Sequence, residues 1–146
     1  MMVSHLALKL ILDLYQIRSY FYQGNWVAVA NEPDDTTRSD EAQLYKYRAR
    51  IELGQAAQVA SEMLEVAPTG AGFDVVRAYA EYRSGHKEKA MEDINGLIQS
   101  DADCNTVQVI GATVLYCEGR VDEALDLLSK HENNLEAYGL SFACLY

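Results

Sequence analysis

Residues 118–131, EGRVDEALDLLSKH, decide the fold, because residues 84–97, SGHKEKAMEDINGL, follow the same pattern. In each copy a glycine is followed five positions later by an alanine, and a helical apolar stripe follows the alanine. The two glycines, Gly85 and Gly119, lie 34 residues apart. This period and punctuation predict a repeated pair of antiparallel helices.

Small residues are required at these positions for physical reasons. Glycine supplies the left-handed backbone that ends the first helix of each pair. Ala90 and Ala124 are expected where the second helix crosses the first, since a larger side chain there would overpack the crossing by about 1–3 kcal/mol. Ala78 and Ala112 are the expected small partners on the first helices. The pattern is that of a tetratricopeptide repeat, whose units stack into a solenoid.

Apolar residues at helical spacing alternate with stop signals along the rest of the chain. Helices are predicted from about Leu10 to Tyr22, from Trp26 to before Pro33, and from a Ser39 cap to Gly54, with a partner helix before Pro68. Further helix pairs are predicted over about 73–99 and 105–130. We therefore predict an all-α fold: a tetratricopeptide-like α-solenoid of about four helix pairs. A single domain is expected over 1–146, with no assignment for 1–9 and 139–146.

The apolar stripes also predict which side chains are buried. The predicted members are Leu10, Leu14, Ile17 and Phe21; Leu44, Tyr47 and Ile51; Ala56, Val59, Ala60, Met63 and Leu64; Val107, Ile110, Gly111, Val114 and Leu115; and Val121, Ala124, Leu125 and Leu128. The turn glycines Gly24, Gly54, Gly85 and Gly119 are separated by 30, 31 and 34 residues. Val29 and Val59 stand where the later units have alanine, so the first two units are expected to pack less regularly.

The charge balance bears on possible partners. With 22 acidic and 12 basic residues, the net charge of −10 opposes binding to nucleic acid or to an anionic membrane surface. Three cysteines without C-x-x-C spacing favour a reducing cytosol. The apolar opening, Met1 to Leu14, is too short for a membrane span and is interpreted as part of the first helix.

The sequence offers no constellation for catalysis, cofactor binding or metal binding. His5, His86 and His131 are scattered, without the spacing of a zinc site. His86 is expected to be solvated, and His131 to end a helix, where a charged imidazole would favour the helix dipole. Cys104 and Cys117 are expected to pack rather than react. We therefore predict that the protein is not an enzyme.

Several segments are similar to the epsilon subunit of coatomer, particularly its fungal forms. They are YFYQGNW at 20–26, RARIELGQ at 48–55, TVQVIG at 106–111 and LLSKHENNLEA at 127–137. The resemblance covers about residues 15–138 and implies the N-terminal portion of a longer solenoid. It further implies a structural, non-catalytic subunit of a vesicle coat that acts in Golgi-to-ER and intra-Golgi transport. The implied partner is the C-terminal region of the alpha subunit. The implied location is the cytoplasm and the periphery of Golgi membranes and coated vesicles, with membrane association only through the coat.

In repeats of this kind the first helices line the concave face, and the residue three before the turn glycine points into it. Together with the residues three positions earlier, this gives the candidate partner-binding set: Arg18, Phe21, Arg48, Ile51, Tyr79, Tyr82, Thr113 and Tyr116. These side chains could instead pack between adjacent units, and for Ile51 packing is the expected role. A free-standing tetratricopeptide adaptor that binds a peptide or helix remains the alternative function. A groove for acidic peptide C-termini fits poorly, because Arg18 and Arg48 are its only obvious cations.

Overall fold

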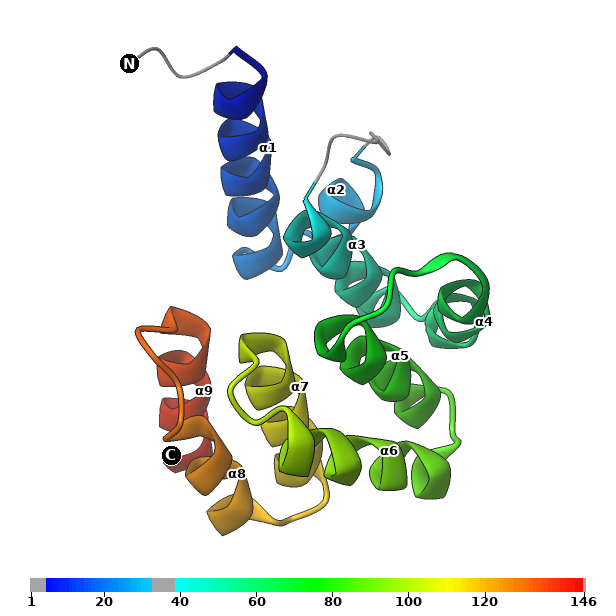
Figure 1. The fold of residues 1–146 in the computed structure, drawn as a ribbon, viewed down its shortest axis with the longest axis vertical. Coiled ribbons are helices and arrows are strands. Elements are labelled where there is room, and N and C mark those ends of the chain that lie inside the picture. Colours follow the sequence, from blue (N-terminus) through cyan, green and yellow to red (C-terminus); the bar gives the residue numbers. More distant parts are fainter. Residues whose placement is uncertain (1–4, 33–38, 146) are drawn as a thin grey trace. The chain divides into compact units, whose positions relative to one another are not determined.

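We describe residues 5–32 and 39–145, with side chains from residue 12 onward, in a computed structural model of the chain (Figure 1). These residues form α-helices and turns, without a strand among them, so the predicted all-α fold is confirmed. The helices are α1 (His5–Tyr22), α2 (Trp26–Ala30), α3 (Asp40–Glu52), α4 (Ala56–Val66), α5 (Ala71–Arg83), α6 (Lys87–Ser100), α7 (Asn105–Cys117), α8 (Val121–Leu128) and α9 (Leu135–Leu145).

Eight of these helices lie where the apolar spacing predicts them, whereas α9 occupies a segment for which the spacing predicts no element. By its internal contacts the chain divides into two compact units, Met1–Val59 and Ala60–Tyr146, which we describe separately. A single domain over the whole chain stays a prediction.

The same backbone turn ends the first helix of each of the four pairs. Gly24, Gly54, Gly85 and Gly119 all have positive φ, between +73° and +107°. Each glycine N–H donates to the carbonyl three residues earlier, and the next N–H donates to the carbonyl five residues before itself. These two hydrogen bonds form the Schellman motif, which satisfies carbonyls at the helix end. Since the left-handed conformation strains other residues, the glycines are required at these turns.

The residue five after each glycine has the same backbone bond and the same burial in all four pairs. Its N–H donates to the carbonyl of the residue that directly follows the glycine, which starts the second helix. The four side chains are fully buried: Val29, Val59, Ala90 and Ala124. The valines of the first two pairs are therefore as deeply buried as the alanines, although α2 has only five residues.

The core of the first unit joins α1, α2 and α3. Ile17 and Phe21 from α1 pack with Val29 from α2 and with Tyr45 from α3. Ser39 caps α3 as predicted, because its Oγ accepts a hydrogen bond from the Ala42 N–H at 3.3 Å. The cap starts α3, and the core contacts hold it against the two preceding helices.

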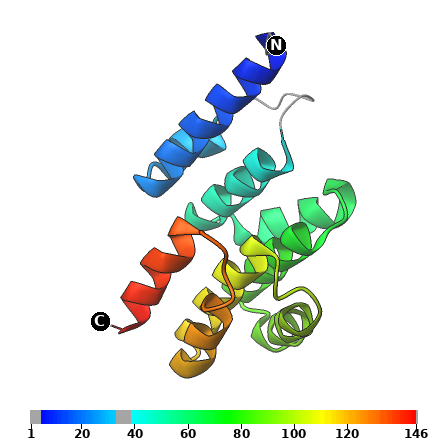
Figure 2. The same cartoon turned by 60° about the vertical axis from the view of Figure 1, so that its left-hand side comes forward.

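In the second unit, helix pairs stack in a repeating order (Figure 2). α5 pairs with α6 and α7 pairs with α8, while α7 also packs on both helices of the preceding pair. α9 packs on α7 and α8 in the same way, and thus occupies the place of the first helix of a further pair. Ala112, Leu115, Ala124, Leu127, Leu128 and Ala137 form the buried cluster that joins α7, α8 and α9.

Gly111 lets α7 approach its neighbours closely. A Cβ at this position would lie 3.0 Å from Leu127 Cδ2 and 3.2 Å from Ile98 Cδ1. The helix backbone here therefore packs directly against side chains from α8 and α6. This glycine serves close packing and, unlike the turn glycines, has no positive φ.

Several predicted core positions need correction. Leu64 is exposed, because it follows the buried Met63 by one position and so lies about 100° further round the helix. Leu44 and Tyr47 are half-buried, whereas the neighbouring positions Ala42, Tyr45 and Ala49 are buried. Leu125 and Val121 are also half-buried, and Leu127, outside the predicted stripe, is buried instead. The predicted stripe of α7 is confirmed, while the side chain of Leu10 lies outside the described residues.

The cysteine and histidine predictions have mixed outcomes. His86 is exposed, as predicted. Cys117 is exposed at the end of α7, so the prediction that it packs is wrong, whereas Cys104 is half-buried. His131 lies beyond α8, where its Nδ1 accepts a hydrogen bond from the Asn134 N–H at 3.3 Å. This hydrogen bond stabilises the turn that follows α8, and the dipole role of a charged imidazole stays a prediction.

Candidate partner-binding surface

The side chains three residues before the turn glycines differ in exposure. Phe21, Ile51 and Tyr82 are buried, whereas 46% of Tyr116 is exposed. The carbonyl of each of these residues accepts the glycine N–H of the turn, so the backbone role is common to all four. The side-chain role is not dictated by the turn. Of the four, Tyr116 alone presents a large accessible surface.

In the first unit, the structure brings Phe21 and Arg48 together. The Arg48 guanidinium carbon lies 4.5 Å from the centroid of the Phe21 ring and 5.6 Å from that of Tyr45. Phe21 also makes an edge contact with Trp26, at 4.9 Å between ring centroids. A guanidinium over an aromatic face is attracted by the ring quadrupole. The pair therefore holds α1 against α3 within the unit.

Arg18 lies on the surface of the same unit and forms an ion pair with Glu41. The side chains of both residues are a little under half exposed. The hydrogen bond to Glu41 raises the pKa of Arg18 above its ordinary value, so the guanidinium stays charged. An ion pair between such solvated side chains contributes little to stability, so it serves mainly as a charged surface group of the first unit.

In the second unit, Tyr79 and Tyr82 are buried but both hydroxyls are hydrogen bonded. Arg83 Nη1 donates to the Tyr79 hydroxyl at 2.8 Å. The Tyr82 hydroxyl donates to Glu118 Oε1 at 2.5 Å, and the Lys87 ammonium lies 5.4 Å from its ring centroid. Since Glu118 ends α7, the Tyr82 bond ties one helix pair to the next. This is the packing role that forms the alternative to partner binding.

The remaining candidates lie on α7. Thr113 is half-buried, and its hydroxyl donates to the Val109 carbonyl at 2.8 Å. Such back-bonding leaves the methyl group as the side chain's main contact surface. Tyr116 is the most exposed aromatic of the candidate set. A tyrosine of this kind suits an interface because it combines an apolar ring with a polar hydroxyl.

The structure also contains a buried carboxylate that sequence reasoning missed. Glu81 is buried on α5, with one oxygen 3.8 Å from the Lys89 ammonium and Oε2 without a hydrogen-bond partner. Gln108 on α7 is buried too; its amide donates to the Ala102 carbonyl at 2.8 Å, while its Oε1 is unsatisfied. Polar residues at these helical positions read as solvent-facing in the sequence. Their burial depends on tertiary packing, for which the sequence carries no local signal.

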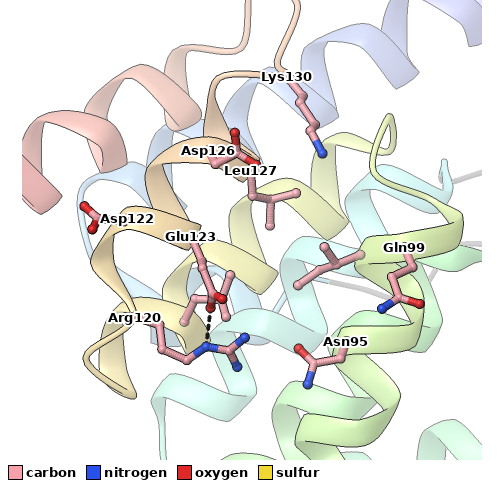
Figure 3. A pocket seen from close by; sticks show the side chains of 10 residues that line it. Asn95, Gln99, Arg120, Asp122, Glu123, Asp126, Leu127 and Lys130 are labelled. Carbon is pink, nitrogen blue, oxygen red and sulfur yellow. Dashed lines mark hydrogen bonds and ion pairs between the residues drawn. The ribbon is translucent and has the colours of Figure 1, made fainter.

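A groove of about 540 Å³ lies between α6 and α8 in the second unit (Figure 3). Its apolar lining comes from Ile98, Leu115 and Leu127. The polar lining comes from both helices and from the turns before and after α8: Asn95, Gln99, Arg120, Asp122, Glu123, Asp126 and Lys130. Arg120 and Glu123 form an ion pair on the α8 side of the groove. None of the predicted partner-binding residues lines it.

The described residues include no group of three or more histidine, cysteine or acidic side chains that could hold a metal ion. Over the same residues, every helix is too short or too polar to cross a membrane. The described residues do present the aromatic and charged side chains of the first helices and the α6–α8 groove as surface features.

Comparison with known proteins identifies a family and a relative. The family model described as coatomer epsilon subunit matches residues 12–146. The probable coatomer subunit epsilon of Schizosaccharomyces pombe is 30% identical over 132 residues, which cover 88% of this chain. The matched region covers 42% of that relative, so the chain spans less than half of its length. No solved structure matched the chain.

Proposed function

This chain belongs to the coatomer epsilon subunit family, and from that membership we propose that it is a structural subunit of the coatomer vesicle coat. The observation that carries the proposal is the family match over residues 12–146, nearly the whole chain. The all-α architecture of stacked helix pairs supports it, because such stacks present extended surfaces to protein partners. The role is non-catalytic: the protein works by binding.

The proposed partner is the C-terminal region of the coatomer alpha subunit, as the family resemblance implies. Because the chain spans 42% of its relative, the partner of the whole protein is itself a proposal for this chain. Tyr116 is the proposed first contact, since it is the aromatic candidate with accessible surface. Arg18, Arg48 and Thr113 are the other candidates that retain accessible surface.

The buried candidates take a supporting role in this proposal. Phe21, Ile51, Tyr79 and Tyr82 would shape the surface from beneath rather than touch the partner. The protein would act in Golgi-to-ER and intra-Golgi transport. It would lie in the cytoplasm, at the periphery of Golgi membranes and vesicles, and reach the membrane through the rest of the coat.

The test is co-purification of this chain with a C-terminal fragment of the coatomer alpha subunit, with light scattering to give the mass of the complex. A discrete complex is the expected result. Tyr116→Ala should weaken it at least about tenfold, a typical loss for a truncated aromatic anchor. Tyr15→Ala is the matched control, because Tyr15 is an exposed tyrosine on α1 outside the candidate set.

Three results would change parts of the proposal. A folded chain that does not bind the alpha fragment would show that these residues do not form the coat contact. Equal loss of binding from Tyr116→Ala and Tyr15→Ala would remove Tyr116 from the interface while leaving the coat function in place. Binding of short free peptides by a chain that ignores the alpha fragment would favour the adaptor alternative.

A further inference from the structure

The groove between α6 and α8 takes no part in the proposed coat contact. Its lining comes from α6, α7, α8 and the turns around α8, all within residues 95–130, and α9 contributes nothing to it. The groove is thus bounded on both sides by described helices and is not an end face of the stack. Its volume of about 540 Å³ lies within the range of sites that bind ligands.

The floor of the groove is apolar. Leu115 and Leu127 are buried there, and the half-buried Ile98 of α6 packs against the cluster that contains them. Figure 3 shows Leu127 pointing from α8 toward α6. An apolar centre within a polar rim is the usual anatomy of a protein interface. The floor can therefore bury a large apolar side chain of a partner.

The α6 wall of the groove is polar but uncharged. It presents the side-chain amides of Asn95 and Gln99, which face α8 and have no hydrogen-bond partner among the described residues (Figure 3). A carboxamide both donates and accepts, as the N–H and C=O groups of a peptide backbone require. Side chains one helical turn apart are separated by about 6 Å, close to the roughly 6.6 Å between alternate residues of an extended chain. The two amides therefore match an extended peptide laid along the groove.

The α8 wall is acidic. The helix contains Asp122, Glu123 and Asp126 and no basic residue. Glu123 is paired with Arg120, whereas the carboxylates of Asp122 and Asp126 have no ion-pair partner among the residues that the structure describes. Lys130 lies beyond the helix end, at the far end of this wall. On a chain with a net charge of −10, such a rim attracts a basic segment and repels an acidic one.

We propose that the α6–α8 groove binds an extended basic peptide segment of a partner protein, in which a large apolar side chain lies next to a lysine or arginine. The apolar side chain enters between Ile98 and Leu127, and the peptide backbone bonds to the amides of Asn95 and Gln99. Because successive side chains of an extended chain point to opposite sides, the neighbouring cation points to the rim and pairs with Asp126.

The experiment measures fluorescence anisotropy of a fluorescein-labelled peptide, Gly-Leu-Arg-Leu-Arg-Gly, with the whole chain. Saturable binding is expected, with a dissociation constant on the order of 100 µM for so small a contact. The acidic peptide Gly-Leu-Glu-Leu-Glu-Gly should bind at least about tenfold more weakly, because its carboxylates meet an acidic rim. Gly-Ser-Arg-Ser-Arg-Gly should also bind more weakly, since it has no side chain for the apolar floor.

A pair of matched variants separates the groove from the general acidity of the chain. Asp126→Asn should raise the dissociation constant of the basic peptide about threefold to tenfold by removing the paired carboxylate. Asp93→Asn is the control, because Asp93 is an exposed aspartate on α6 outside the groove lining. It changes the net charge equally and should bind like the wild type. Both residues are exposed, so the variants should stay folded, as circular dichroism would verify.

Nuclear magnetic resonance locates the bound peptide. On titration with the basic peptide, the side-chain amide signals of Asn95 and Gln99 should shift. The side-chain amide signal of Asn105 should not, because this exposed residue starts α7 outside the groove lining. Shifts that spare Asn95 and Gln99 would place the peptide elsewhere and overturn the proposal.

Three results in the binding assay would also overturn the proposal: a basic peptide that does not bind saturably, equal affinity for the basic and acidic peptides, or equal losses from Asp126→Asn and Asp93→Asn. The proposal does not rest on the coat function, because its readout uses the isolated chain and a free peptide. Asp126→Asn should leave co-purification with the alpha fragment unchanged, so the two proposals can fail separately.

Discussion

The Tyr82 hydroxyl on α5 donates a hydrogen bond to the carboxylate of Glu118, which ends α7, although the two residues are 36 positions apart. The bond connects equivalent turns of successive helix pairs, since Tyr82 lies three residues before Gly85 and Glu118 directly precedes Gly119. It joins a buried ring to an exposed carboxylate and adds to the packing of α5 on α7. Removal of this hydrogen bond should therefore lower the stability of the fold more than it lowers the affinity for a partner.

Tyr82→Phe is expected to lower the free energy of unfolding by about 1 kcal/mol, because it removes the hydrogen bond but keeps the ring. Tyr82→Ala should cost about 3–5 kcal/mol, since it also leaves a cavity. Urea denaturation measures both. Tyr116→Phe is the control and should change little, because Tyr116 is nearly half exposed. Equal stability of Tyr82→Ala and the wild type would show that the ring is not packed.

The same tyrosine should make stability depend on alkaline pH. Burial and the hydrogen bond to Glu118 raise the pKa of Tyr82 to about 12, while the pKa of an unfolded tyrosine is about 10. The folded state therefore holds the proton more tightly, and its contribution is complete below pH 10 and lost as the pH rises from about 10 to 12. Wild-type protein should lose more stability over this interval than Tyr82→Phe does. Parallel curves for the two proteins would refute the assignment.

Two glycine substitutions should distinguish the contribution of helix propensity to stability from that of side-chain packing. Gly96 in α6 has open space where a Cβ would lie, so Gly96→Ala should raise the free energy of unfolding by about 0.5–1 kcal/mol. Gly111→Ala gains the same propensity but forces Leu127 and Ile98 to shift. It should be less stable than Gly96→Ala by about 1–3 kcal/mol, the usual cost of overpacking. Thermal or urea unfolding of the two variants provides the comparison.

The two arginines of the first unit should differ in their effect on stability. Arg48→Ala should cost about 1–2 kcal/mol, because the guanidinium is stacked over Phe21 and its removal also exposes the ring. Arg18→Ala should cost no more than about 0.5 kcal/mol, since its ion pair with Glu41 is largely solvated. The small Arg18 effect should disappear in about 1 M salt, whereas the Arg48 effect should persist. Equal, salt-sensitive losses would contradict the stacking role.

Asn134 is expected to hold the start of α9. Its Oδ1 accepts hydrogen bonds from the N–H groups of Glu136 and Ala137, at 3.0 and 3.4 Å. Asn134→Ala should therefore cost about 1 kcal/mol, while Asn134→Asp should be nearly neutral because aspartate caps equally well. Hydrogen exchange of the α9 amides measures the effect locally. Unchanged protection in Asn134→Ala would mean that packing alone starts the helix.

The parts of the fold that follow local rules are predictable from sequence. The turn glycines and the crossing residues Ala90 and Ala124 form a pattern because each must satisfy a backbone or steric requirement within one helix pair. α9 lacks those markers: its glycine lies mid-helix, and it is apolar on most sides. Adjacent apolar residues also leave open which of the two faces the core, and the burial predicted for Leu64 is wrong because Met63 takes the buried place.

The candidate partner-binding residues are harder to predict, because their exposure depends on neighbours that are distant in sequence. A tyrosine at a regular position has the same local signal whether the next repeat or another protein covers it. Tyr82 and Tyr116 occupy equivalent places, yet one is buried and the other nearly half exposed. The difference depends on tertiary neighbours, which the local sequence pattern does not specify. Exposure therefore reduces the predicted set to the side chains that a partner can reach.

The four similar glycine turns affect how the sequence of such a chain can diverge in evolution. Each turn is closed by the same two backbone hydrogen bonds, one of which goes to the carbonyl of Phe21, Ile51, Tyr82 or Tyr116. The connection thus requires a glycine but accepts an aromatic or an aliphatic side chain three positions before it. Surface chemistry can diverge from one repeat to the next while the connection is inherited unchanged.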